Sequence, residues 1–284
     1  MLSDGDRYVV TLVALEGISH GDTQSGVSNP TNTRLFMRHT MLVNGAPLRV
    51  PDISENSLRS VIFRQPLHSH LLDALETPKG SLPQPVMNLL FSGGNLASGS
   101  TAPGNEVDLG HRIRELYPTL RLLGGATDSF VLPKSALKLA AWPVAREFVM
   151  PLRYVAPDLV SEAEEVSVFD LLSEETRTRG TGSESSGNQM LYTYETLAAG
   201  TKVVLEVTFA PRTPEPVKAA AALALGEWDG YFGGQGRQGR GRMVVDGAPG
   251  DPTPYLEHIE KYGETMKAGL TDGTLGTGKA ICVL

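Results

Sequence analysis

Residues 201–245 decide the fold: TKVVLEVTFAPRTPEPVKAAAALALGEWDGYFGGQGRQGRGRMVV. Apolar residues alternate at 203, 205, 207 and 209, which predicts a β-strand with one buried face. Thr213-Pro214 has the sequence of a helix start, and an apolar stripe from Val217 to Trp228 predicts a helix over 214–229. A glycine-rich loop at 233–241 then leads into a short strand at 242–245. This stretch therefore supplies a strand, a helix and a strand.

The preceding sequence supplies the complementary half. A β-branched run at 8–15 predicts a buried strand, and leucines at helical spacing predict a helix from about 54 that is kinked or restarted at Pro66. Asp52 and Glu55 have capping-box spacing at its start. A strand at 190–195 and a tight turn at 198–200 come before the strand at 201–209. The order strand, helix, strand, strand, helix, strand predicts an α+β, ferredoxin-like fold, as in RNA-recognition motifs.

The remaining segments are expected to be insertions. Residues 34–43 and 46–50 predict a β-hairpin, because Asn44-Gly45 between them suits a two-residue turn. Residues 77–105 are rich in Gly, Pro, Ser and Asn and predict little regular structure, whereas 106–117 predict a short helix ended by Pro118. Residues 177–188 are small and polar and predict a flexible segment without a core.

Composition excludes several classes of protein. The chain of 284 residues is 40% hydrophobic, which excludes general disorder, and it has no run of eighteen apolar residues that could span a membrane. One cysteine excludes a disulfide framework and a cysteine-based zinc site. A soluble, cytoplasmic protein is expected. The formal charge is −7, and residues 154–175 alone carry seven acidic side chains and no Lys or Arg. That segment predicts either a solvated helix face or a contact with a basic partner.

Three short motifs match enzyme signatures but lie in the wrong structural context. Gly17-Ile18-Ser19-His20-Gly21 follows the first strand, but no helix follows to make a serine nucleophile elbow. The G-x-G-x-x-G match at 234–239 lies between a helix and a strand, the reverse of a dinucleotide-binding site. The match at 273–279 has Ala280 where a P-loop needs Ser or Thr. We therefore expect no catalytic residue, no metal ligand and no cofactor from these motifs.

A basic and glycine-rich set of residues predicts nucleic-acid binding. Residues 34–64 contain five Arg against Asp52 and Glu55, and the glycine loop at 233–242 adds three Arg and no acid. Glycine-rich backbone can approach phosphate closely, and Arg binds phosphate through two hydrogen bonds. The alternative is a set of ordinary surface arginines. The candidate RNA-binding residues are Arg34, Arg38, His39, Asn56, Ser57, Arg59, Arg64, Gly233, Gly234, Gln235, Arg237, Gln238, Arg240 and Arg242.

These blocks resemble the CRISPR-associated RAMP superfamily, specifically the backbone subunits of its type IV or type I branch. The resemblance lies in residues 50–59 before the first helix, in 194–201, and in the glycine-rich loop at 233–242. It implies one hand-shaped domain over 1–284. The palm would comprise 6–16, 52–75 and 190–246, the fingers 17–51 and 76–155, the thumb about 156–189, and 247–284 a C-terminal extension.

The resemblance also implies a function. Such subunits oligomerise head to tail along CRISPR guide RNA, present it for pairing with target DNA or RNA, and contact other effector-complex subunits, without a membrane. RNA-cleaving relatives carry Asp in the loop after the first strand, where this chain has Ser28, so no cleavage is expected. Two alternatives remain: a guide-processing endoribonuclease of the same superfamily with His20 or His39 as general base, or a generic protein-interaction module.

Overall fold

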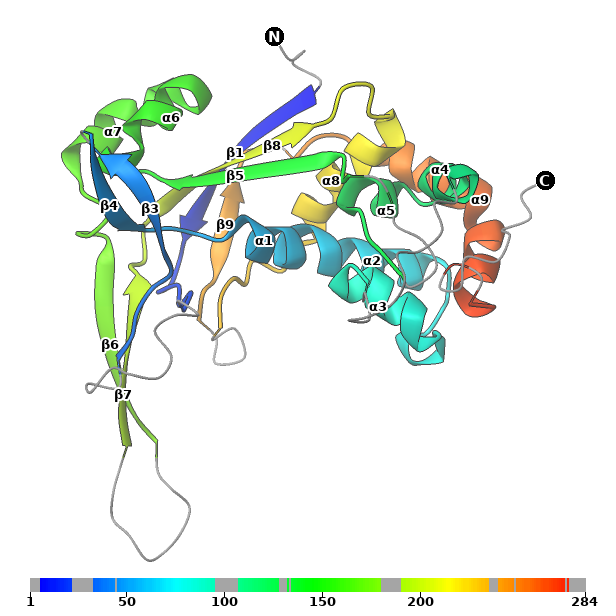
Figure 1. The fold of residues 1–284 in the computed structure, drawn as a ribbon, viewed down its shortest axis with the longest axis horizontal. Helices are drawn as coiled ribbons and strands as arrows, with labels where there is room; N and C mark the ends of the chain where they lie inside the picture. The colour runs from blue at the N-terminus through cyan, green and yellow to red at the C-terminus, as the bar shows by residue number, and fades with distance from the viewer. Residues whose placement is uncertain are drawn as a thin grey trace, which may run out of the picture.

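A four-stranded antiparallel sheet forms the centre of the protein. The computed structural model describes residues 6–21, 33–43, 45–94, 107–127, 132, 134–179, 190–234, 240–247, 249–273 and 275. The sheet contains β1 (Arg7–Ala14), β5 (Leu137–Pro143), β8 (Lys202–Phe209) and β9 (Met243–Asp246) in the order β5-β8-β1-β9 (Figure 1). Counted along the chain, this is the 4-1-3-2 order of a ferredoxin-like sheet. The predicted α+β, ferredoxin-like class is confirmed.

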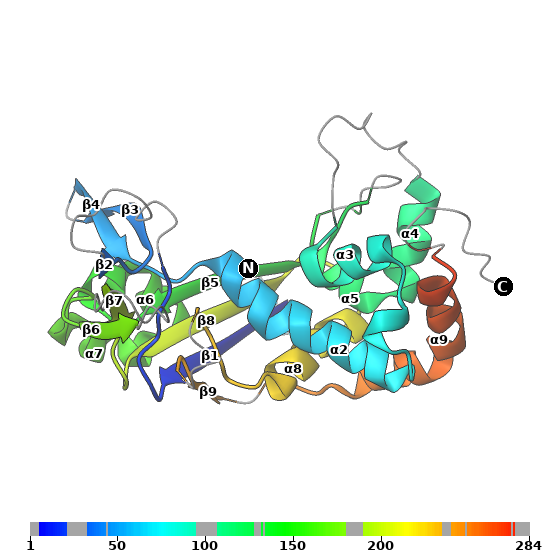
Figure 2. The same ribbon diagram turned by 90° about the horizontal axis from the view of Figure 1, so that it is seen from below.

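The main core lies between this sheet and the helices on one of its faces. These are α1 (Glu55–Leu58), a π-helical turn (Arg59–Arg64), α2 (Gln65–Ala74) and α8 (Glu215–Glu227), and Figure 2 shows α2 and α8 side by side next to the strands. Leu12, Leu205 and Val207 point from the strands into the same buried cluster as Phe63 and Ala221. Each fully buried large apolar side chain stabilises the fold by roughly 1.5–3 kcal/mol.

A smaller core covers part of the opposite face. It is built by the hairpin of β3 (Arg38–Val43) and β4 (Ala46–Pro51) together with α6 (Val149–Val155) and α7 (Val160–Glu165). A short 3-10 turn at Arg146–Phe148 leads into α6, and another at Pro157–Leu159 connects α6 to α7. Val50, Phe148 and Leu152 pack there against Val204 of β8. The hairpin is therefore attached to the sheet through side chains.

The helical end of the molecule contains α3 (Gln84–Ser92), α4 (Val107–Leu116), α5 (Pro118–Leu123) and α9 (Thr253–Thr271), with a 3-10 turn at Lys79–Ser81. The Tyr117 hydroxyl donates to the Met266 carbonyl at 2.8 Å, which joins α9 to the turn between α4 and α5. None of the helices in the described residues has the length and apolar character that crossing a bilayer requires.

A long hairpin of β6 (Leu172–Arg179) and β7 (Met190–Leu197) projects from the body, as Figure 1 shows. Its register pairs Leu172 with Leu197 and Arg179 with Met190. A two-residue strand, β2 (Thr33–Arg34), runs parallel to β7 with Arg34 opposite Tyr194. This pairing brings an N-terminal segment beside the middle of β7.

The sheet differs from the sequence prediction in one strand. The segment at 190–195 was expected to supply the second sheet strand, but β7 pairs with β6 and β2 instead. Residues 137–143, expected inside an insertion, form edge strand β5 and pair with β8 from Leu137–Phe209 to Pro143–Val203. The prediction is wrong because a strand-like pattern identifies a strand and not its partner.

Smaller predictions differ too. Residues 79–92 are largely helical, and the predicted hairpin begins at Arg38 because Arg34 pairs with β7. Ser54 caps α1, its side chain accepting the Ser57 N–H, whereas Asp52 pairs with His39. The helix continues past Pro66, because the π-turn before it accommodates the missing N–H and the bulk of the proline ring.

Of the segment expected to be flexible, 177–179 belong to β6 and 180–188 lie outside the described residues. The acidic residues Glu162, Glu164 and Glu165 are exposed on α7.

Buried His68 predicts acid sensitivity. Burial between α2 and α3 lowers the pKa of His68 to about 3, and the charge of Arg64 adds to this lowering. Its ring nitrogens make no well-formed hydrogen bond, and the nearby Leu90 carbonyl opposes only part of the shift. An unfolded histidine has a pKa near 6.5. The unfolded state therefore binds the extra proton first, and stability falls as the pH drops below about 6.5.

Between pH 5.5 and 4, His68 should lower the unfolding free energy of the wild type by about 1.4 kcal/mol for each pH unit. His68→Leu should lack this part of the loss. Urea unfolding at several pH values measures this decline. His111→Leu is the matched control, because His111 is exposed on α4. Equal slopes in the wild type and the His68 variant would contradict the prediction.

Candidate nucleic-acid interface

One cavity of about 460 Å³ gathers segments that are far apart in the sequence. The loop after β1, strand β2, the start of the first helix, strand β7 and the root of the glycine-rich loop each contribute. The lining residues are Ser19, His20, Gly21, Arg34, Ser57, Ser60, Val61, Tyr194, Phe232, Gly233 and Gly234. Among these residues Arg34 is the one cation and none is a carboxylate. The cavity therefore favours an anionic ligand.

His20 is a neutral part of the cavity wall. Its Nε2 accepts the backbone N–H of Ser54 at 3.2 Å, so the ring proton belongs on Nδ1. Its ring lies 5.2 Å from Phe232 and 5.9 Å from Phe36, measured between centroids. Burial lowers the pKa of His20, which keeps it uncharged at neutral pH. His20 thus ties the cap of α1 to the glycine-loop root.

Arg34 reaches the cavity because β2 pairs with β7. This pairing places Arg34 opposite Tyr194, another lining residue. A Cβ added to Gly21 would lie 2.9 Å from the Arg34 Nε, so the arginine side chain passes directly over this glycine. Gly21 itself forms a bridge with Phe36. The arginine is exposed, so its guanidinium is available to a ligand.

The root of the glycine-rich loop has a backbone that other residues cannot easily adopt. Gly233 has φ +98°, and a Cβ there would lie 2.3 Å from the Ser19 carbonyl oxygen. Gly241 has φ +82°, and a Cβ there would lie 2.0 Å from the Phe232 carbonyl oxygen. The Gly234 N–H donates to Ser19 at 2.9 Å. This amide therefore holds the loop against the cavity wall and is not a free phosphate donor.

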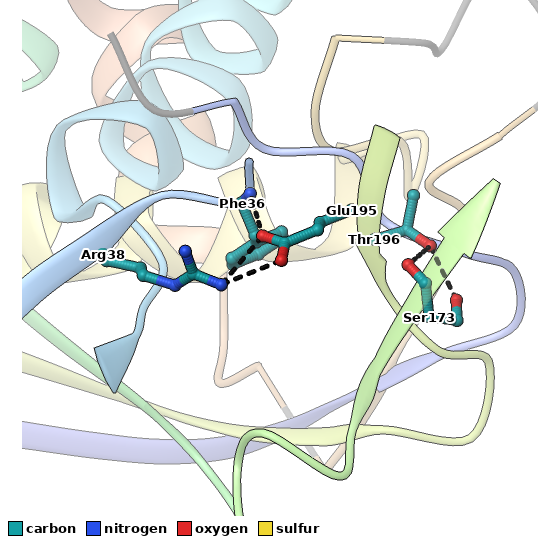
Figure 3. A network of polar contacts seen from close by, with 5 residues as sticks. All are labelled: Phe36, Arg38, Ser173, Glu195 and Thr196. Atoms are coloured by element: carbon teal, nitrogen blue, oxygen red, sulfur yellow. Dashed lines mark hydrogen bonds and ion pairs between the residues drawn. The ribbon is translucent and has the colours of Figure 1, made fainter. Parts of the chain in front are cut away.

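Glu195 of β7 anchors the segment that carries Arg34 (Figure 3). Its carboxylate accepts the Phe36 N–H at 2.8 Å and the Arg38 guanidinium at 2.9 and 3.0 Å. The two charged side chains are only 18% and 12% exposed, which strengthens their attraction. On the neighbouring β6, the Ser173 hydroxyl is 2.9 Å from that of Thr196. These contacts attach the β2–β3 segment to β7 and β7 to β6.

The structure separates the candidate residues into groups. Arg34, Ser57, Gly233 and Gly234 line the cavity, and Asn56 is exposed beside it. Four others contact protein groups: Arg38 pairs with Glu195, His39 with Asp52 at 2.7 Å, Arg240 with Glu175, and Arg59 donates to Ser135 at 2.8 Å.

The remaining candidates lie elsewhere. Burial lowers the pKa of Arg64, which is packed beside Gly93, and Arg242 is exposed beside its bridge to Tyr231. Gln235, Arg237 and Gln238 lie outside the described residues, as do Asp22 and Ser28. Within the described residues, no group of three or more His, Cys, Asp or Glu is arranged to hold a metal ion.

Sequence reasoning missed most of the wall. Ser60, Val61, Tyr194 and Phe232 were not among the candidates, and His20 was considered only as a possible base. Phe232 directly precedes the glycine loop, and Ser60 follows Ser57 at helical spacing, so both could have been found by extending those motifs. Tyr194 begins the 194–201 block of the resemblance but was not a predicted ligand, and it enters the wall through the pairing of β7 with β2.

Comparison with known proteins supports the fold. No protein-family model and no curated protein sequence matches this chain. Among solved structures, a chain of "Type IV-B CRISPR Complex" is similar with a TM-score of 0.55 and 19% identity, covering 84% of this chain and 89% of that one. A chain of "CRISPR RNA-guided surveillance complex, pre-nicking" has a TM-score of 0.42 and 13% identity, covering 84% and 74%. The first similarity shows a shared fold, whereas the second is too weak to show one.

We expect Gly233→Ala to destabilise the protein by at least about 2 kcal/mol, because it combines a positive φ with a backbone clash. Gly234→Ala is the matched control, since its added Cβ meets nothing within 4 Å. That control should stay within about 0.5 kcal/mol of the wild type. Chemical denaturation measures both, and similar losses would show that the loop root relaxes freely.

A double-mutant cycle tests the anchor. Arg38→Ala and Glu195→Ala should show a coupling energy of about 1.5–3 kcal/mol, because a partly buried charge loses its partner. The Lys202–Glu162 pair is 37% and 47% exposed, and its cycle should give less than about 1 kcal/mol. Urea unfolding of the four variants in each cycle supplies the numbers. Equal couplings would mean that burial contributes nothing to the anchor.

Proposed function

We propose that this chain is a non-catalytic backbone subunit of a CRISPR effector complex that binds the guide RNA. The observation that carries the proposal is the cavity, whose single described cation, Arg34, faces no lining carboxylate. The similar chain in "Type IV-B CRISPR Complex" supports it, because a chain with this fold occurs in such an assembly. The type IV or type I branch fits best.

The cavity suits a nucleic-acid backbone more than a base edge. Arg34 can bind a phosphate, while the half-buried Tyr194 offers aromatic surface to a sugar or base. Aromatic surfaces and phosphate contacts accept any sequence. Sequence would then be read by pairing of the guide with target DNA or RNA, while the protein holds the guide.

The projecting β6–β7 hairpin suits contact between copies. It extends away from the sheet and helices (Figure 1), so its far end can reach a neighbouring molecule. Contact between a hairpin and a different surface of the next copy is heterologous, and such contacts build rings or filaments. We propose head-to-tail filaments along the guide, joined by other effector subunits in the cytoplasm.

The endoribonuclease alternative has less support in the described residues. The Nε2 lone pair of His20 already accepts the Ser54 N–H, so it is occupied by the fold. The Nδ1 of His39 faces the Asp52 carboxylate at 2.7 Å, but His39 does not line the cavity. A general base must reach the proton that it removes. Binding without cleavage is therefore the function that we favour.

We expect Arg34→Ala to weaken RNA binding by a similar factor for unrelated guide sequences. It should also reduce the slope of log affinity against log salt by about 0.7, the change for one phosphate contact on single-stranded RNA. Fluorescence anisotropy at several salt concentrations measures both quantities. Arg153→Ala is the matched control, because it removes the same charge from an exposed pair with Glu164 on α6 and α7.

Loss of affinity for only one guide sequence would indicate base reading and contradict this prediction. If Arg34→Ala and Arg153→Ala reduced RNA affinity equally, the cavity would not be part of the RNA-binding surface. The same preparations should leave labelled repeat RNA intact. Cleavage that disappears in His39→Ala would favour the endoribonuclease instead.

A further inference from the structure

We propose that the cavity selects ribose over deoxyribose through Ser57 and Ser60, and this inference rests on the proposed binding of RNA there. Both serines line the cavity, and they are three residues apart on the first turns of one helix. The ribose 2′-hydroxyl is the group that distinguishes RNA from DNA, and it both donates and accepts hydrogen bonds. A serine hydroxyl can do the same and is therefore a suitable partner.

The position of these serines follows from the local fold. The Ser54 cap fixes the start of α1, and the π-helical turn over Arg59–Arg64 follows directly. Residues three and four apart share a helix face, so Ser60 and Val61 both join Ser57 in the wall. Arg59 lies outside this set and donates to Ser135 beside β5. The helix thus presents the Ser57 and Ser60 hydroxyls to the cavity, while the cation between them in the sequence, Arg59, contacts Ser135 instead.

The composition of the wall suits a sugar as well as a phosphate. Only Arg34 among the described lining residues is charged, whereas Ser19, Ser57, Ser60 and His20 are neutral polar groups. A site for phosphate alone gains most from several cations. Neutral hydroxyls add little to phosphate attraction, but they distinguish a sugar that has a 2′-hydroxyl from one that lacks it.

Both serines can be changed without altering the backbone of the helix. Ser57 supports the cap through its N–H, which donates to the Ser54 hydroxyl at 3.3 Å. Ser60 supports the π-turn through its carbonyl, which accepts the Gln65 N–H. Alanine keeps both backbone groups and is the better helix former. Ser57→Ala and Ser60→Ala should therefore remain folded.

The test compares the full chain with its variants on one sequence made as RNA, as DNA and as 2′-O-methyl RNA. We expect wild type to bind RNA more tightly than DNA, with 2′-O-methyl RNA weakened toward DNA. Each serine variant should lower the ratio of the DNA to RNA dissociation constants about fivefold, the effect of one neutral hydrogen bond. The DNA affinity should hardly change. Ser69→Ala, on the exposed side of α2, is the control.

Two outcomes separate the failure of this inference from failure of the proposed function. If Arg34→Ala weakens RNA binding but the ratio stays the same in Ser57→Ala, Ser60→Ala and the double variant, ribose selection by these serines is overturned and RNA binding stands. If Arg34→Ala has no effect on any of the three oligonucleotides, the cavity does not bind the backbone and the proposed function fails. Equal RNA and DNA affinities in the wild type would also overturn the inference.

Discussion

The partly buried Glu195 carboxylate is the constraint on which the cavity depends. A carboxylate withdrawn from water needs hydrogen-bond donors, and Glu195 obtains them from the Phe36 N–H and the Arg38 guanidinium. Phe36 lies between β2 and β3 and Arg38 is the first residue of β3, so satisfying one acid fixes this segment against β7. Arg34 then lies opposite Tyr194 and faces the cavity. An arginine that looks like an RNA ligand in the sequence, Arg38, thus serves the fold and allows Arg34 to face solvent.

Local patterns predicted the strands and helices of the central sheet layer better than the pairing of its strands. The strands at β1, β8 and β9 and the helices α1–α2 and α8 follow from apolar periodicity and from start signals such as Thr213-Pro214. The fourth strand could not be assigned in this way, because β5 and β7 both have strand-like sequences. Adjacency in the chain favoured β7 as the neighbour of β8. Strand β5 packs three side chains into the main core, Leu137, Leu139 and Ala141. This packing favours β5 as the neighbour of β8, but it exists only in the folded protein and is not visible in the sequence.

The candidate site was predictable where one segment carries the signal. The glycine loop and Arg34 stand out by composition, and Ser57 lies in a recognisable helix start. Composition does not reveal whether an arginine has a protein partner, and Arg38, Arg59 and Arg240 all have one. Their partners lie on strands and loops from other parts of the chain. The same long-range packing placed His20 and Tyr194 in the wall, although neither was among the predicted RNA-binding residues.

The parts of the cavity wall are also synthesised at different times, because they lie far apart in the sequence. Ser19 and His20 leave the ribosome first, and Phe232, Gly233 and Gly234 close the cavity only after about two hundred further residues have been made. At typical elongation rates these two events are separated by roughly 10–40 s. Strand β9, which completes the sheet, follows the loop. A nascent chain therefore exposes Arg34 before the site is complete, and full recognition of a ligand begins only after residues 232–234 have been made.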